Sequence, residues 1–174
     1  RLALADHSTD TLEKARHYLL TMKTRALTSI AETWLEDGLE KSNPRAIAAA
    51  MIPYQFAILK SPRNPQLRFD FAKALERAGA AYFLKSSQRY LESAALAKQE
   101  FLNGNSGREM LMRNSVESLI RVLAWQGDYS SAEKYCHSYL NLGYQDFKDG
   151  DSIKGILKKV RKRKNPFWKE LKRL

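Results

Sequence analysis

Residues 116–144 read VESLIRVLAWQGDYSSAEKYCHSYLNLGY, and this stretch decides the fold class. Apolar residues recur in it every three or four positions, at Val116, Leu119 and Leu123, which is the spacing of one face of an α-helix. Gly127 is predicted to stop this helix, because glycine readily adopts the backbone conformation that closes a helix C-terminus. A second helix is predicted directly after the turn, so the stretch encodes a hairpin of two helices.

The same helical spacing continues on both sides of this hairpin. No run of alternating apolar and polar residues indicates a strand, and no turn dipeptide of the β-hairpin type lies between two such runs. Glycine stops at Gly38, Gly79 and Gly127 divide the chain at intervals of 41 and 48 residues. The three predicted helical hairpins lie at roughly residues 8–60, 65–102 and 107–143.

The ends of several helices are marked by capping residues. Ser8 or Thr9 is predicted to cap a first helix that continues to Gly38. Asn43 is predicted to begin a second helix, which Pro53 kinks. In the fourth helix, the residues that build the apolar face are predicted to be Tyr82, Leu84, Leu91, Ala94, Ala95 and Leu102.

Hairpins of this kind cannot bury their apolar stripes alone. Stacking three of them side by side gives a continuous core, which is the construction of an α-solenoid. The predicted fold class is therefore all-α, with antiparallel helical hairpins stacked as a short α-solenoid. A compact helical bundle is the alternative, since it uses the same hairpins and short loops.

The composition agrees with a folded protein and excludes several classes. The chain has 174 residues, of which 44% are hydrophobic and 28% charged, and such a chain is able to bury a core. A single cysteine, Cys136, cannot form an internal disulfide, so small disulfide scaffolds are excluded. No run approaches the roughly 20 apolar residues of a membrane-spanning helix, so no transmembrane segment is expected. The compartment stays open, and we favour a soluble, cytoplasmic protein.

The positive charge is concentrated near the C-terminus. Residues 1–153 carry 20 basic and 18 acidic side chains, whereas residues 154–174 carry ten basic side chains and only Glu170, which is +9 of the net +11. We therefore divide the chain into a helical-repeat domain, residues 1–153, and a basic amphipathic C-terminal segment, residues 154–174. The candidate anion-binding residues are Lys158, Lys159, Arg161, Lys162, Arg163 and Lys164.

Three interpretations of this segment remain open. Its cations could neutralise the phosphates of a nucleic acid. The segment could lie on an anionic membrane surface, with Phe167 and Trp168 at the interface. It could also pack Phe167 and Trp168 onto the body of the protein as a closing helix with a solvated basic face.

Residues 116–144 resemble a tetratricopeptide repeat. In that family large residues line the first helix, a Gly-Asp-Tyr-like turn follows, and an alanine lies where the second helix passes closest to the first. The chain departs from the family pattern at Ile120, where a small residue is usual, and at Cys136 and Tyr139 in the second helix. Weaker matches cover residues 71–84 and 27–38. The matching residues in the strongest repeat are Val116, Leu119, Leu123, Gly127, Asp128, Tyr129 and Ala132.

The resemblance implies a binding function. In tetratricopeptide arrays the first helix of each hairpin lines a concave groove that holds a peptide. Basic side chains together with an asparagine and aromatic rings would suit a peptide that carries carboxylates. The alternative is that these charged side chains are solvated and paired at helical spacing. The groove positions of the family fall here on Phe69, Asp70, Lys73, Arg77, Asn114, Glu117, Arg121 and Trp125.

No catalytic or metal-binding pattern accompanies these residues. The histidines, His7, His17 and His137, are far apart and belong to no ligand motif. Cys136 and His137 are adjacent, so on a helix their side chains diverge by about 100°. The glycine-containing residues 103–107 follow no predicted strand, which a phosphate-binding loop requires.

We therefore predict no enzyme, no metal and no cofactor. The predicted function is that of a protein interaction module or scaffold, which binds a protein or peptide partner in its groove. The basic segment would make a second, anionic contact, with a nucleic acid or an anionic membrane surface. The alternative is a nucleic-acid-associated protein that binds phosphates through the C-terminal cations.

Overall fold

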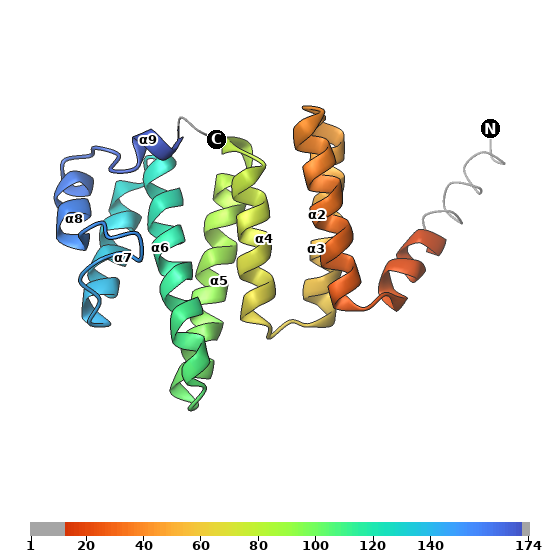
Figure 1. Cartoon of the computed structure of the whole chain (residues 1–174), viewed down its shortest axis with the longest axis horizontal. Helices are drawn as coiled ribbons and strands as arrows, with labels where there is room; N and C mark the ends of the chain where they lie inside the picture. The colour runs from red at the N-terminus through yellow and green to blue at the C-terminus, as the bar shows by residue number, and fades with distance from the viewer. Residues whose placement is uncertain (1–12, 172–174) are drawn as a thin grey trace. The chain divides into compact units, whose positions relative to one another are not determined.

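The computed structural model describes residues 13–171, and within them every regular element is a helix (Figure 1). The predicted all-α class is confirmed. An isolated bridge between Asp146 and Ser152 is the one strand-like pairing in that range. The chain forms two compact units, Arg1–Pro62 and Arg63–Leu174, each with its own helix contacts.

The first unit is built on an antiparallel hairpin of α2 (Thr24–Glu40) and α3 (Pro44–Lys60). Asn43 caps α3 as predicted, because its Oδ1 accepts hydrogen bonds from the backbone N–H groups of Arg45 and Ala46, at 3.1 and 3.3 Å. Pro53 lies inside α3 without ending it. The buried hydrophobic residues of the hairpin are Leu27, Ala31, Leu35, Ala50, Met51, Tyr54 and Ala57.

The first predicted helix is not continuous. Residues 13–21 are helical, but the chain bends at Met22 and is extended at Lys23, where φ is −67° and ψ is 145°. The prediction of one continuous helix as far as Gly38 is therefore wrong. The spacing of apolar side chains does not report a local change in the backbone angle ψ. The cap predicted at Ser8 or Thr9 lies outside the described residues.

Gly38 has a different role from the one predicted. It lies inside α2, which continues to Glu40, and it is buried. A Cβ atom on Gly38 would stand 2.8 Å from the backbone nitrogen of Ile47 and 2.9 Å from its Cγ1. The glycine therefore lets the backbones of α2 and α3 approach each other, while the chain turns at Ser42, where φ is 47°.

Gly38→Ala is expected to destabilise the first unit, because the added methyl group has to displace the backbone of α3. Overpacking of this kind costs about 1–3 kcal/mol. The matched control is Gly155→Ala in α8 (Ile153–Arg161), where the nearest atom to an added Cβ is 3.9 Å away. This control should stabilise the protein by up to about 1 kcal/mol, since alanine favours a helix over glycine. Thermal unfolding followed by circular dichroism compares the two, and equal midpoints would contradict the close helix contact.

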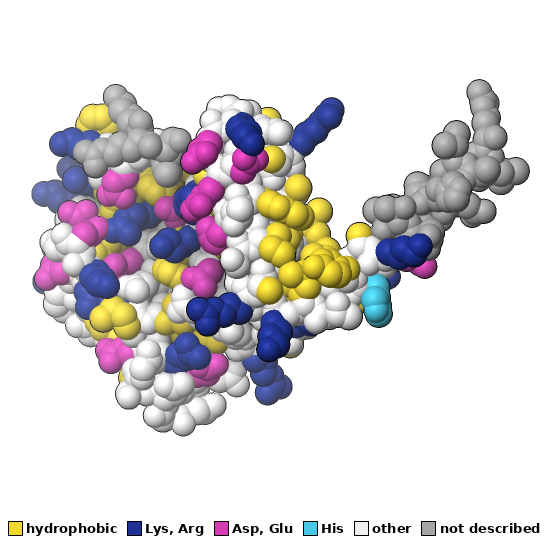
Figure 2. All heavy atoms as spheres, turned by 45° about the vertical axis from the view of Figure 1, so that its right-hand side comes forward, with side chains coloured by type: hydrophobic (Ala, Val, Ile, Leu, Met, Phe, Trp, Pro, Cys, Tyr) yellow, Lys and Arg dark blue, Asp and Glu magenta, His cyan; other side chains and the backbone are white. Residues whose placement is uncertain are grey.

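Hydrophobic side chains also lie on the outside of this hairpin. The charged residues of α3 are Arg45 and Lys60, which lie at its two ends. Ile52 and Leu59 are 45% and 71% exposed, and Trp34 of α2 is 45% exposed. Figure 2 shows hydrophobic side chains gathered on one side of the first unit. The helix α3 is thus apolar on more sides than its contact with α2 covers.

The second unit is a series of helices in which each long helix packs against the next. Asn64 caps its first helix, since its side chain accepts a hydrogen bond from the backbone N–H of Leu67 at 3.3 Å. Gly127 closes the first helix of the hairpin quoted above, with φ at 77°, so the predicted stop is confirmed. The helices are α4 (Pro65–Arg77), α5 (Phe83–Leu102), α6 (Glu109–Trp125), α7 (Tyr129–Asn141), α8 and α9 (Trp168–Leu171), with single 3-10 turns at Ala80–Tyr82 and Ser106–Arg108.

The buried side of α5 differs from the one predicted. Ala94 is buried as expected, but Leu84, Leu91 and Leu102, which were expected to face the core as well, are 65%, 41% and 71% exposed. The core side instead carries buried serines. Ser86 donates a hydrogen bond to the carbonyl of Ala72 at 2.9 Å, and Ser93 donates one to the carbonyl of Pro65 at 2.8 Å. Both serines are fully buried. Small side chains that bond to a neighbouring backbone can lie in a helix contact, so hydrophobicity alone selected the wrong side.

The basic C-terminal segment contributes to the core of the second unit. One side of α8 is buried, and Phe167 beyond it is 1% exposed and stacks on Phe147, with ring centroids 6.0 Å apart. Trp168, by contrast, is 49% exposed. The change in charge predicted a boundary between residues 153 and 154, but both residues belong to the second unit. The structure divides after Pro62 instead. The buried residues of α8 are Ile153, Ile156, Leu157 and Val160.

Candidate functional site

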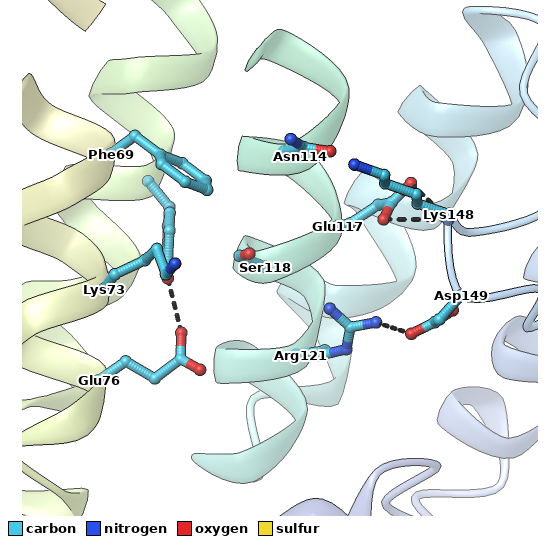
Figure 3. A pocket seen from close by; sticks show the side chains of 10 residues that line it. Phe69, Lys73, Glu76, Asn114, Glu117, Ser118, Arg121, Lys148 and Asp149 are labelled. Carbon is cyan, nitrogen blue, oxygen red and sulfur yellow. Dashed lines mark hydrogen bonds and ion pairs between the residues drawn. The ribbon is translucent and has the colours of Figure 1, made fainter. Parts of the chain in front are cut away.

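An open cavity of about 430 Å³ lies on the second unit, between α4, α6 and the loop before α8 (Figure 3). In the close view, Phe69 and Lys73 come from one side, on α4, and Asn114 and Arg121 come from α6. The loop before α8 supplies a third wall. The lining residues are Phe69, Lys73, Glu76, Tyr90, Asn114, Glu117, Ser118, Arg121, Lys148 and Asp149.

Five of the eight residues predicted for the groove line this cavity, namely Phe69, Lys73, Asn114, Glu117 and Arg121. The other three do not.

Asp70 accepts a hydrogen bond from Gln66 Nε2 at 2.8 Å, within its own helix. Trp125 packs on Phe83, with ring centroids 5.4 Å apart, and its Nε1 donates to the carbonyl of Phe167 at 3.2 Å. Arg77, in the last turn of α4, is exposed and does not line the cavity.

Sequence reasoning missed the other five lining residues. Glu76 and Ser118 lie one helical turn beyond Lys73 and Asn114, so extending the two helix faces by a turn would have included them. Tyr90 belongs to α5, whose buried side was misassigned. No signal in the sequence brings Lys148 and Asp149 to α6, because a loop has no periodicity.

Glu117 fastens the loop to α6 and is itself 3% exposed. Its carboxylate accepts hydrogen bonds from Arg113 Nε at 3.0 Å, from the hydroxyl of Tyr139, and from the backbone N–H of Lys148 at 3.1 Å. Burial and this carboxylate raise the pKa of Tyr139, so its hydroxyl remains a donor. Glu117 therefore positions the cavity wall, and its carboxylate is held mainly by groups of the protein itself.

Arg121 is also committed to the protein. Its guanidinium carbon lies 5.4 Å from the ring centre of Phe147 and 5.5 Å from that of Phe167. It pairs with Asp149, and its Nε lies 3.3 Å from Glu170 Oε2. Its charge is thus balanced by two carboxylates, although its Nε makes no hydrogen bond within the described residues.

Glu76 and Tyr90 form a hydrogen-bonded pair at the edge of the cavity, in which Tyr90 is buried and Glu76 is half-buried. The Tyr90 hydroxyl donates to Glu76 Oε2 at 2.6 Å. Burial raises the pKa of Glu76, although this hydrogen bond and the charges of Arg121 and Lys73 act in the opposite direction. Burial and the neighbouring carboxylate raise the pKa of Tyr90. Glu76 is thus hydrogen-bonded within the chain, and Lys73 lies in its electrostatic field.

Two cations of the cavity are not held in ion pairs within the described residues. Lys73 is exposed, with its Nζ 5.9 Å from the ring centre of Phe69, and it makes no ion pair with the described residues. Lys148 is likewise exposed and unpaired among them, and Figure 3 shows its side chain extending over Glu117 in the direction of Asn114. The groups available to a ligand are thus two ammonium groups, a half-buried ring and an amide.

The six predicted anion-binding residues lie in and after the last turn of α8, and all are exposed. Arg161 differs from the others, because its Nε lies 2.7 Å from Glu133 Oε1 and its Nη2 lies 3.0 Å from His137 Nε2. The hydrogen bond from Arg161 lowers the pKa of Glu133. Arg163, with φ at 51°, lines a small hollow at the start of α7.

Other chemical groups of the described residues are dispersed. Within residues 13–171, no three His, Cys, Asp or Glu side chains are grouped as metal ligands. Burial raises the pKa of the Cys136 thiol to about 12. No helix in this range is long and apolar enough to cross a membrane.

No protein-family model, no curated protein and no solved structure matches this chain. Its class is therefore defined by its own fold and cavity. It is an all-α protein whose second unit carries an open cavity with two lysines that form no ion pair with a described residue.

Proposed function

We propose that this chain is a non-catalytic protein interaction module, which binds an acidic peptide segment in the cavity between α4 and α6. One observation carries the proposal: Lys73 and Lys148 line the cavity and form no ion pair with a described residue, whereas the carboxylates of Glu117 and Asp149 are already held by the chain. A ligand that brings its own carboxylates would supply the missing partners, and hydrogen bonds between charged groups are the stronger ones.

The remaining cavity groups suit a peptide better than a free ion. Phe69 is half-buried and held edge-on by Tyr90, with ring centroids 5.5 Å apart, so it offers a rigid apolar surface. The amide of Asn114 can both donate to and accept from a peptide backbone. Together with the two lysines, these groups recognise a short acidic segment that also carries an apolar side chain.

The order of the helices supports the same function. The cavity is lined mainly by α4 and α6, which are the first helices of successive hairpins, and tetratricopeptide arrays use these helices to line their groove. Ala132 is fully buried at the start of α7, as expected for the position where two helices of that family pass closest. We therefore propose a tetratricopeptide-like module.

A binding role without chemistry is supported by the state of the titratable groups. Tyr90 and Tyr139 have raised pKa values, so both stay protonated at neutral pH. Glu117 and Arg121 hold the loop and the aromatic rings in place. A general acid or base needs a group free to exchange protons with a substrate, and these groups are engaged elsewhere.

Lys73→Ala and Lys148→Ala are each expected to weaken the binding of an acidic peptide by roughly tenfold. A charge-assisted hydrogen bond contributes about 1.5–3 kcal/mol, and about 1.4 kcal/mol corresponds to a factor of ten. The probe is a set of fluorescein-labelled octapeptides of Glu and Leu, compared with matched peptides of Gln and Leu. Fluorescence anisotropy gives the dissociation constants.

Lys85→Ala is the matched control, because Lys85 is an exposed lysine of α5 that does not line the cavity. It should leave peptide binding unchanged. Equal affinity for the Glu and Gln peptides, or equal losses in all three variants, would refute acidic-peptide recognition at this cavity.

A further inference from the structure

The outer side of α8 carries a row of lysines at a fixed spacing. Lys154 and Lys158 lie four residues apart on one side of α8, about 6 Å from each other, and Lys162 continues this spacing at the residue that caps the helix. The opposite side is anchored in the core through Ile156 and Val160, which are 4% and 1% exposed. The row therefore belongs to a packed helix.

The hollow beside these lysines lies between side chains of this one helix and its cap. A cavity of about 360 Å³ is lined by Lys154, Leu157, Lys158, Arg161 and Lys162. Arg161 is positioned at its edge by Glu133 of α7. The three lysines make no ion pair with any residue in the described part of the chain.

The spacing of these lysines has an electrostatic cost for the folded protein, although cations in the last turn of α8 also interact favourably with the helix dipole. Like charges at intervals of four residues on a helix repel each other and destabilise it. No acidic residue lies between Asp151 and Glu170 in the sequence, while Lys159, Arg163 and Lys164 add further positive charge nearby. A regularly charged polyanion is the ligand that would relieve this repulsion.

We propose that this α8 surface is a second binding site, separate from the cavity between α4 and α6, and that it binds the phosphate backbone of a nucleic acid. Each lysine would neutralise one phosphate of a strand that runs along the helix, while Arg161 holds the edge of the site. Recognition of this kind does not depend on base sequence, because the cations contact phosphates and not base edges.

The packing of α8 argues against a membrane as the ligand. An amphipathic helix binds a bilayer by inserting its apolar face, but the apolar face of α8 is buried in the protein. Ile153, Ile156, Leu157 and Val160 are all less than 9% exposed. Of the two aromatic residues expected at a membrane interface, Phe167 is buried as well.

The test measures how the affinity for DNA depends on salt between about 50 and 200 mM. The probes are a fluorescein-labelled duplex of about 20 base pairs and one of its single strands. For the full chain, we expect binding to either probe that weakens steeply with salt and is the same for a second base sequence. In the duplex titration, the triple variant Lys154→Gln, Lys158→Gln, Lys162→Gln should lower the slope of log affinity against log salt by about 2 to 3. Its affinity at the lowest salt should fall at least tenfold.

The control variant is Lys23→Gln, Lys85→Gln, Lys98→Gln, which removes the same charge from exposed positions outside α8. Its salt slope should match that of the unchanged chain, and circular dichroism should show both triple variants folded. Equal losses in the two triple variants would overturn the proposal, because they would reflect net charge alone. It would also be overturned by stronger binding to vesicles of phosphatidylserine than to the nucleic acid probes, or by no binding to either probe.

Discussion

A chain that ends at Ile153 is expected to lose the cooperative unfolding of its second unit and to aggregate. The truncation removes Ile156, Leu157, Val160 and Phe167, all of which are buried. Burying a large apolar side chain contributes roughly 1.5–3 kcal/mol, so the four together contribute about 6–12 kcal/mol. This approaches the whole stability of a typical domain, about 5–15 kcal/mol. Thermal unfolding and analytical size exclusion measure the effect.

Phe167→Ala provides a graded version of the same test, which does not depend on a soluble truncated protein. It removes the ring that stacks on Phe147 and lies over Arg121, and should cost about 3–5 kcal/mol. The Lys154→Gln, Lys158→Gln, Lys162→Gln variant changes the exposed side of the same segment and should leave the midpoint nearly unchanged. A chain ending at Ile153 that unfolds at the midpoint of the full chain would show that the segment is a separate tail.

Glu117→Ala is expected to destabilise the second unit by about 3–5 kcal/mol, which is the cost of removing one partner from a buried ionic contact. The substitution leaves the backbone N–H of Lys148 without its acceptor and Arg113 without its carboxylate, so that Arg113 Nε keeps only the Tyr139 hydroxyl, at 2.8 Å. It also releases the loop that carries Asp149, so the wall of the cavity loosens. Urea unfolding followed by circular dichroism gives the free energy of unfolding.

Two further variants separate this contact from a general effect of removing a carboxylate. Glu117→Gln keeps the shape and the acceptor oxygen, so it should recover part of the loss. Glu133→Ala removes a carboxylate that is 37% exposed and pairs with the exposed Arg161, and should leave the free energy of unfolding nearly unchanged. If Glu117→Ala cost no more than Glu133→Ala, the buried carboxylate would not be what holds the loop.

Helix ends were the most predictable part of the fold. Asn43 and Gly127 were assigned their roles correctly from sequence, since a cap or a stop is satisfied by backbone groups within a few residues. Gly38 shows the limit of that reasoning. The same residue type was interpreted as a stop, but its neighbour in space is Ile47 on the next helix.

The candidate cavity was predictable only where helices line it. Phe69, Lys73 and Asn114 follow from the resemblance to a repeat and from the helical faces of α4 and α6. That Glu117 and Arg121 are already paired could not be predicted, because their partners Lys148 and Asp149 lie on a loop far along the chain. How many cations of the cavity are left without an ion pair is thus a property of the folded chain.

By itself, the sequence determined the all-α class, the succession of helices and the row of lysines at residues 154, 158 and 162, because helical spacing and capping act over a single turn. Tertiary structure decided which side of each helix is buried. Ser86 and Ser93 lie inward on α5 because neighbouring carbonyls accept their hydroxyl hydrogens. It also placed Phe167 in the core, since only contact with Phe147 and Arg121 distinguishes a packed segment from a solvated basic tail.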